Sequence, residues 1–108
     1  MNSYVSTTVN APSNVAIRCA YDAILSFERI KDSYLKENIN TIYAKLLFKS
    51  NFKGEISCII TARESSNNSS IITITANVLD MNNSFEGITH EFVAEFLEEF
   101  SELLEQEG

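Results

Sequence analysis

The side chains that could do chemistry in this sequence begin with a single histidine. His90 lies close to Glu86 and Glu91, and an imidazole beside a carboxylate is a pairing used in general acid–base catalysis. A lone imidazole cannot form the histidine pair of many zinc sites. By helical spacing His90 also falls off the apolar stripe that contains Phe92. We therefore interpret it as a solvated surface histidine.

The two cysteines are candidate nucleophiles. Cys19 and Cys58 lie far apart and belong to no CxxC pair, which indicates reduced thiols in the cytoplasm rather than a disulfide framework. Cys58 alternates with Ile56 and Ile60, so we expect a buried thiol that behaves as a small hydrophobe and has a raised pKa. We predict a catalytic role for neither thiol.

Carboxylates dominate the end of the chain. Residues 80–108 carry nine acidic side chains and no Lys or Arg, whereas the first 79 residues carry eight basic and six acidic groups. Metal and two-carboxylate sites need convergent groups that face inward. These glutamates instead occupy the face opposite the phenylalanines of a predicted helix. We predict a solvated helix face without metal or cofactor, formed by Glu91, Glu95, Glu98, Glu99, Glu102 and Glu105.

No short catalytic or nucleotide-binding motif is present. GxGxxG, GxxxxGK[ST] and GxSxG are all absent, and the three glycines are scattered. The sequence therefore predicts a protein that is not an enzyme.

Length and composition indicate one globular domain over residues 1–108, with 44% apolar and 21% charged residues. The net charge of −7 disfavours nonspecific attraction to nucleic acid or anionic lipid. There is no signal-peptide pattern and no apolar run approaching the roughly 20 residues of a membrane span. We expect a cytoplasmic protein.

Two helices are expected to hold the candidate residues. The apolar stripe of residues 14–28 predicts the first helix, capped by Ser13 after a strand over 4–9. The second is predicted over 88–106, capped by Ser84 or Thr89 and with Glu91 in its first turn. Residues 29–35 extend the first helix or form a strand, and we favour the strand.

Three further strands alternate with period two, over residues 41–49, 55–63 and 71–79. A one-residue slip would expose every apolar side chain of the inner face, so the register should be well fixed. Loops at 51–54 and 65–70 suit antiparallel hairpins. The inner face is predicted to hold Ile42, Ala44, Leu46, Phe48, Ile56, Cys58, Ile60, Ala62, Ile72, Ile74, Ala76 and Val78.

These elements predict an α+β fold in the order β-α-β-β-β-β-α, an antiparallel four- to five-stranded sheet with two helices packed on one face. The residues Ala11-Pro12-Ser13, the three alternating strands and the closing helix over 92–104 resemble small bacterial domains with a TATA-binding-protein-like fold. The alternative is a trimmed helix-grip fold, similar to Bet v 1 and START-like ligand carriers, for whose full sheet the chain looks short. A fold alone transfers no function.

The outer face of the sheet is the candidate interaction surface. It mixes apolar and basic side chains and could form a patch of a few hundred Å², a size that suggests a binding site. We predict a non-catalytic protein-binding domain, either a homodimer through this face or an acidic inhibitor such as an antitoxin. The surface consists of Tyr43, Lys45, Leu47, Lys49, Ile59, Thr61, Arg63, Ile71, Thr73 and Leu79.

Two other partners stay open. Nucleic-acid binding through the sheet is disfavoured, because the face offers three basic groups and one aromatic ring on an acidic protein. A small apolar ligand could lie between sheet and helices, where Ala44, Ala62 and Ala76 leave room. The competing expectation is that the phenylalanine-rich helix fills that room.

Overall fold

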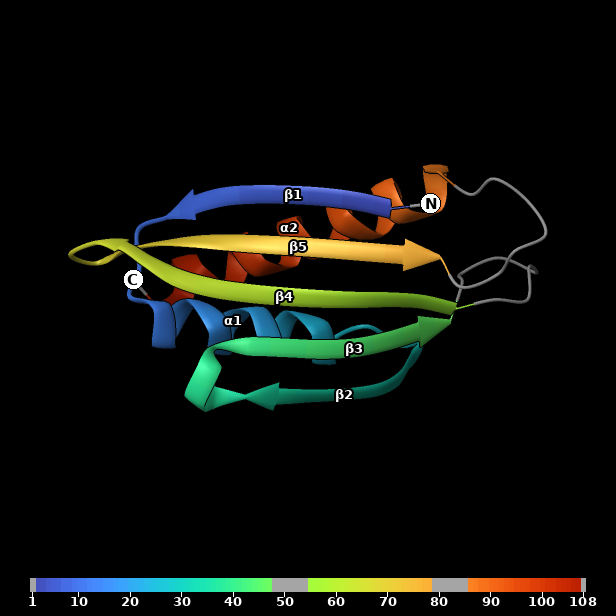
Figure 1. Ribbon diagram of the computed structural model, residues 1–108, viewed down its shortest axis with the longest axis horizontal. Coiled ribbons are helices and arrows are strands. Elements are labelled where there is room, and N and C mark those ends of the chain that lie inside the picture. The colour runs from blue at the N-terminus through green and yellow to red at the C-terminus, as the bar shows by residue number, and fades with distance from the viewer. Residues whose placement is uncertain (1, 48–54, 79–85, 108) are drawn as a thin grey trace.

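The structure, a computed structural model, describes residues 2–47, 55–78 and 86–107. It contains five strands, two α-helices and one short 3-10 helix (Figure 1). In chain order these are β1 (Asn2–Val9), α1 (Ser13–Leu25), β2 (Ile30–Lys36), the 3-10 helix η1 (Glu37–Ile39), β3 (Thr41–Leu47), β4 (Glu55–Ser66), β5 (Ser69–Val78) and α2 (Glu86–Glu107).

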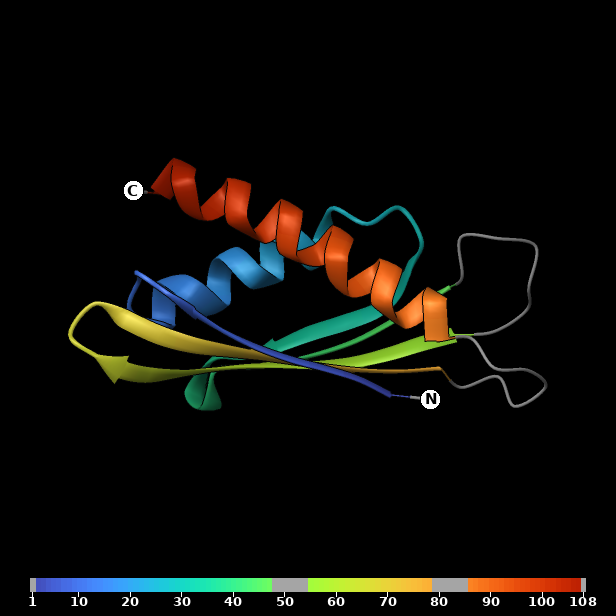
Figure 2. The same cartoon turned by 90° about the horizontal axis from the view of Figure 1, so that it is seen from above.

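The five strands form one sheet in the order β1-β5-β4-β3-β2. All four neighbouring pairs are antiparallel. Both helices lie on the same side of this sheet (Figure 2). The predicted α+β fold is confirmed, and the segment after α1 is a strand, as favoured from the sequence.

The core contains the inner-face residues that the period-two alternation predicted. Ten of the twelve inner-face residues lie within the described side chains, and all ten are at most 6% exposed. Phe48 and the side chain of Val78 lie outside the described residues. Because Ala44, Cys58 and Ala76 are direct partners across β3, β4 and β5, the inner face is in one continuous register.

The helices cover this inner face in a staggered arrangement. α1 packs against strands β2 to β5, whereas α2 packs against α1, β1 and β5. The first half of α2 lies close to the sheet, and its second half passes over α1 (Figure 2). Phe96 and Phe100 of α2 are buried and stack with ring centroids 5.6 Å apart, so the predicted apolar stripe of this helix is a core element.

The structure corrects the ends of α1. The helix begins at Ser13, and Pro12 occupies the N-cap position without a side-chain cap. The Ser13 hydroxyl is buried and accepts a hydrogen bond from Asn40 Nδ2 at 3.3 Å. The helix ends at Leu25 rather than near residue 28. At Ser26 the hydroxyl donates to the carbonyl of Ala23 at 2.6 Å, a local bond that competes with helix continuation.

The beginning of α2 and the β4–β5 turn also differ from prediction. α2 begins at Glu86, so Thr89 is a buried residue of its first turn rather than a cap, and Glu91 falls in the second turn. Ser84 lies outside the described residues. The predicted loop over 65–70 is a two-residue turn between Ser66 and Ser69. Asn68 has φ 58° there, and asparagine tolerates this left-handed conformation better than most residues.

None of the helices in the described ranges is both long and apolar enough to span a lipid bilayer.

Candidate functional site

The sheet presents two surfaces with different chemistry, and the predicted interaction residues lie on the outer one. Four of them are exposed and four are half-buried, while Lys49 and Leu79 lie outside the described residues. Their role in binding a partner stays a prediction. The exposed four are Lys45, Leu47, Ile59 and Arg63, and the half-buried four are Tyr43, Thr61, Ile71 and Thr73.

A row of large side chains crosses this outer face. The pairing register places Tyr34, Tyr43, Ile59, Thr75 and Tyr4 opposite one another from β2 to β1. Among them, Tyr4, Tyr34 and Ile59 are 68%, 46% and 41% exposed, which is high for side chains of this size. The outer face therefore carries an apolar and aromatic band from one edge of the sheet to the other.

Sequence reasoning missed both ends of that band. Outer-face residues were predicted only on the three strands with regular alternation. Tyr34 also alternates with Asp32 and Lys36 at the same period of two. The rings of Tyr34 and Tyr43 stack with centroids 5.1 Å apart and planes at 22°. Lys36 Nζ lies 6.0 and 5.7 Å from these two centroids, within the range of a cation–π contact.

The charges of the outer face are mixed. Lys31 forms an ion pair with Glu55 at the margin of the sheet. The pKa of Glu55 lies below its ordinary value because Lys31 donates a hydrogen bond to it, with added attraction from the charges of Lys31 and Lys45. Since one basic group is already paired, the face offers few cations for phosphates.

The inner face carries small side chains along one row. Ser33, Ala44, Cys58 and Ala76 are successive partners across β2, β3, β4 and β5. Burial raises the pKa of Cys58 to about 12, so its thiol is neutral at physiological pH and matches the expectation of a small hydrophobe. The rows on either side carry larger residues, namely Leu35, Ile42, Ile60 and Ile74 on one side and Leu46 and Ile56 on the other.

An aromatic pair lies where the segment after α1 meets α2. The rings of Phe27 and Phe92 have centroids 5.4 Å apart and a tilt of 47°. Phe92 is buried, whereas Phe27 is half-buried. The pair therefore marks the margin of the interior, between the first half of α2 and the chain that enters β2.

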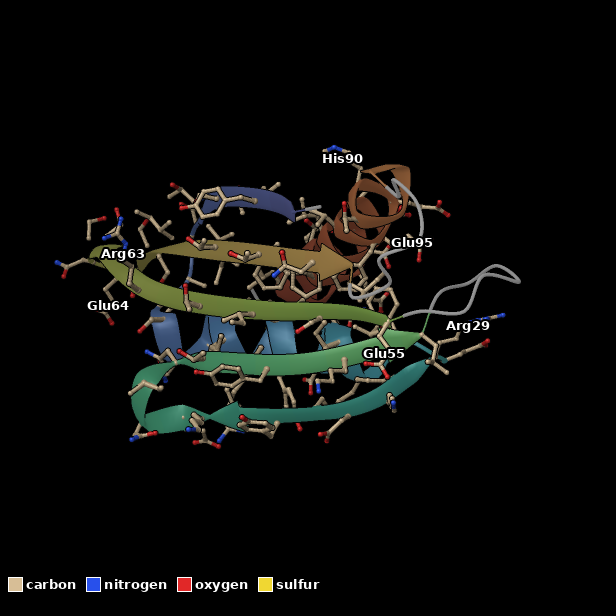
Figure 3. The ribbon with its side chains drawn as sticks, turned by 45° about the vertical axis from the view of Figure 1, so that its right-hand side comes forward. Arg29, Glu55, Arg63, Glu64, His90 and Glu95 are labelled. Carbon is tan, nitrogen blue, oxygen red and sulfur yellow. The ribbon has the colours of Figure 1, made fainter. Side chains whose placement is uncertain are left out.

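The ionisable residues considered first do not meet at this interior. His90 is exposed and points away from the sheet, beyond β1 (Figure 3). Among the acidic residues of α2, Glu95 and Glu99 are half-buried and the others of the predicted face are exposed: Glu91, Glu98, Glu102 and Glu105. Among the side chains that the structure describes, which exclude that of Glu86, no His90–glutamate site opens onto the inner face.

No family model matches this sequence, and no curated protein matches it. Solved structures match its fold. The Zhui aromatase/cyclase from Streptomyces sp. R1128 is 14% identical with a TM-score of 0.57, over 94% of this chain and 84% of that one. A START superfamily protein from Mycobacterium smegmatis is 13% identical with a TM-score of 0.56, over 98% of this chain and 95% of that one.

The di-domain ARO/CYC StfQ from the steffimycin biosynthetic pathway has a TM-score of 0.64 at 10% identity. The match covers 94% of this chain but 43% of StfQ, so this chain spans less than half the length of that protein. At such identities the likeness concerns the fold alone.

These comparisons correct two predictions. The prediction that the chain is not an enzyme is wrong, because structures of the same fold include aromatase/cyclases, and the absence of short motifs does not exclude catalysis in this fold. The argument that the chain is too short for a helix-grip fold is also wrong, since it covers 95% of the START superfamily structure. The TATA-binding-protein-like resemblance gains no specific support. In fold, this chain is similar to START superfamily and aromatase/cyclase structures.

Proposed function

We propose that this chain binds a small apolar molecule between the inner face of its sheet and its two helices. The observation that carries the proposal is the row of small side chains, Ser33 to Ala76, on the sheet face that α1 and α2 together cover. Support comes also from the fold, which is similar to that of a START superfamily protein and of aromatase/cyclases.

The row of small residues sets where a ligand would lie. Alanine, serine and cysteine are shorter than the isoleucine and leucine side chains on both sides, so we place the ligand along this row across β2 to β5, which we call the trough. In the structure buried rings of α2, Phe92 and Phe96, occupy this side of the sheet. A bound molecule would take up space along the trough as these rings change rotamer.

The chemistry of the lining defines the ligand class. Apart from Ser70, whose hydroxyl donates to the carbonyl of Ala11 at 2.6 Å, the buried inner-face residues of the central strands are aliphatic side chains and the neutral thiol of Cys58. Burying a charged group against them would carry a large desolvation cost. We therefore expect an uncharged, predominantly apolar molecule, with a flat ring system preferred because the trough runs across several strands.

The access route follows from the margin of the interior. Phe27 belongs to the segment between α1 and β2, and Phe92 belongs to α2. Their ring pair joins the two elements between which a ligand would pass. Separation of this pair would open the interior without breaking a hydrogen bond of the sheet.

The test is a ligand panel on wild-type protein and two matched variants. The panel contains uncharged polycyclic phenols, a saturated fatty acid and charged analogues of the phenols, and binding is measured by thermal shift and calorimetry. Ala76→Leu fills the trough, whereas Thr75→Leu places the same leucine side chain at the neighbouring position on the outer face. Circular dichroism verifies that both variants fold.

We expect wild type and Thr75→Leu to bind an uncharged ring compound, and Ala76→Leu to bind it at least tenfold more weakly. Binding by no panel member, or equal binding by folded Ala76→Leu, would reject the proposal.

A second function rests on the outer face, where the band from Tyr34 to Tyr4 is the observation that favours it. We propose that another protein, the partner, binds this chain through the band in the cytoplasm. Tyr34→Ser and Ile59→Ser should abolish retention of that partner while leaving binding of the apolar ligand unchanged. Loss of ligand binding in these variants would argue against two separate surfaces.

A further inference from the structure

The two edges of the sheet differ in how they are protected against pairing with another strand. The β2 edge carries Lys31, Asp32 and Lys36, and its register is irregular between Ile30 and Asp32. Charged residues and bulges are the usual devices that keep an edge strand from pairing with another chain. Both devices thus protect the β2 edge from pairing with another strand.

The β1 edge has neither device. Residues Asn2 to Val9 pair with β5 in an unbroken register over eight residues. The strand carries no charged residue and no proline, and half of its residues are valine or threonine, which favour strands. Of the strands that the structure describes, none pairs with the other side of β1.

From His90 onward, the flank of the helix beside this edge carries uncharged residues. α2 packs against β1, and His90 lies beyond β1 while Glu95 lies on the opposite flank of the helix (Figure 3). The residues that follow His90 on its flank, at steps of four and three, are also uncharged. They are Ala94, Leu97, Ser101 and Leu104.

From this we infer that β1 pairs with β1 of a second copy of the chain, antiparallel about a two-fold axis. The two five-stranded sheets then become one continuous sheet. The first half of α2 lies beside the edge strand that the partner extends (Figure 1). An isologous contact of this kind uses one surface twice and closes as a dimer.

The distribution of charge is our reason for proposing a second copy of this chain as the partner of β1. Each chain carries a net charge of −7, so most contacts between two copies would bring like charges together. The β1 edge is uncharged, as is the flank of α2 from His90 to Leu104, while Glu95 lies on the opposite flank. Antiparallel pairing also places outer side chains beside outer ones, so Tyr4, Ser6 and Thr8 meet their counterparts on one face.

The test uses two lysine substitutions that lie one strand apart. Ser6 Oγ and Thr73 Oγ1 are 2.9 Å apart on the outer face. Ser6→Lys and Thr73→Lys each remove this contact and add one positive charge, but only Ser6 belongs to the edge strand. Sedimentation velocity from about 1 to 500 µM at physiological salt measures the dimer dissociation constant of each protein.

We expect wild type and Thr73→Lys to dimerise with similar constants, and Ser6→Lys to dimerise at least tenfold more weakly. A wild type that stays monomeric over this range would overturn the inference, as would equal dimerisation by Ser6→Lys.

Hydrogen exchange of the wild type gives a second readout that needs no variant. Amides of β1 should exchange more slowly at 500 µM than at 1 µM, while amides at the outer side of β2 should not change. Protection that is independent of concentration in β1 would contradict the inference even if Ser6→Lys failed to fold.

Discussion

Tyr34 and Tyr43 lie directly opposite each other on β2 and β3, with their rings stacked at 5.1 Å and 22°. Lys36 Nζ lies about equally far from both ring centroids, at 6.0 and 5.7 Å. β2 is an edge strand of the sheet. This cluster therefore connects the edge strand to β3 through side-chain contacts as well as backbone hydrogen bonds.

The tyrosine pair should be energetically coupled. In a double-mutant cycle of Tyr34→Ala and Tyr43→Ala, we expect a coupling energy of about 0.5–1.5 kcal/mol from urea unfolding, as for other aromatic pairs. Tyr4 and Tyr43 are separated in the same row by Thr75 and Ile59. Their cycle is the control and should be additive, so equal coupling in both cycles would contradict a direct ring contact.

Phe96 should be the most costly residue of α2 to truncate. Its side chain is fully buried at 0% exposure and stacks on Phe100. Phe96→Ala should lower the free energy of unfolding by about 3–5 kcal/mol, the usual cost of a buried phenylalanine. Glu98→Ala, at an exposed position of the same helix, should change it by less than about 0.5 kcal/mol. Similar small effects at both positions would show that α2 is not a core element.

Cys58 should make stability fall at alkaline pH. Its pKa is about 12 in the folded protein against an ordinary value of 9.0, so the unfolded state loses this proton first as the pH rises. The unfolded state then binds fewer protons than the native state, and the free energy of unfolding decreases above about pH 9. This contribution is complete below pH 9 and is lost as the pH approaches 12.

The measurement compares wild type with Cys58→Ala between pH 7 and 10.5. The difference in unfolding free energy should be constant up to about pH 9 and then change by at most about 1.4 kcal/mol per pH unit. A difference that stays flat to pH 10.5 would mean that the thiol is not desolvated.

Glu55 should titrate below its ordinary range because of Lys31. Lys31→Met removes the hydrogen bond to the carboxylate, so the pKa of Glu55 measured by NMR should rise. A carboxyl group with a lowered native pKa contributes stability at neutral pH that is lost as the pH falls through that pKa. Lys45→Met should raise the pKa of Glu55 less, because Lys45 acts only through its charge. Equal effects of the two substitutions would argue against the Lys31 hydrogen bond.

The sequence was sufficient to predict the inner face of the sheet, because period-two alternation leaves only one way to bury Ile42, Ile60 and Ile74. It was insufficient at the ends of elements. Ser13 has the right type for an N-cap, but its hydroxyl accepts a hydrogen bond from Asn40, the residue after η1, a contact that no local pattern reveals. Asn68 likewise closes a two-residue turn within a run of serines and asparagines that reads as a longer loop.

The candidate sites depend on spacing between strands that are distant in sequence. The band from Tyr34 to Tyr4 needs β1 beside β5, which adjacent alternating segments do not reveal. The trough needs the register that aligns Ala44, Cys58 and Ala76. The three alanines singled out from the sequence were the right residue type, but Ala62 lies in a different row, opposite Ile72.

The central claim is that an apolar molecule lies against the inner face of the sheet, and methyl NMR tests it most directly. On addition of the tightest-binding uncharged ring compound of the panel, the methyl signals of Ala44 and Ala76 should shift and show intermolecular NOEs to it. Ile59, on the outer face, should show neither. NOEs confined to Ile59, or no change at the alanine methyls under saturating compound, would contradict the claim.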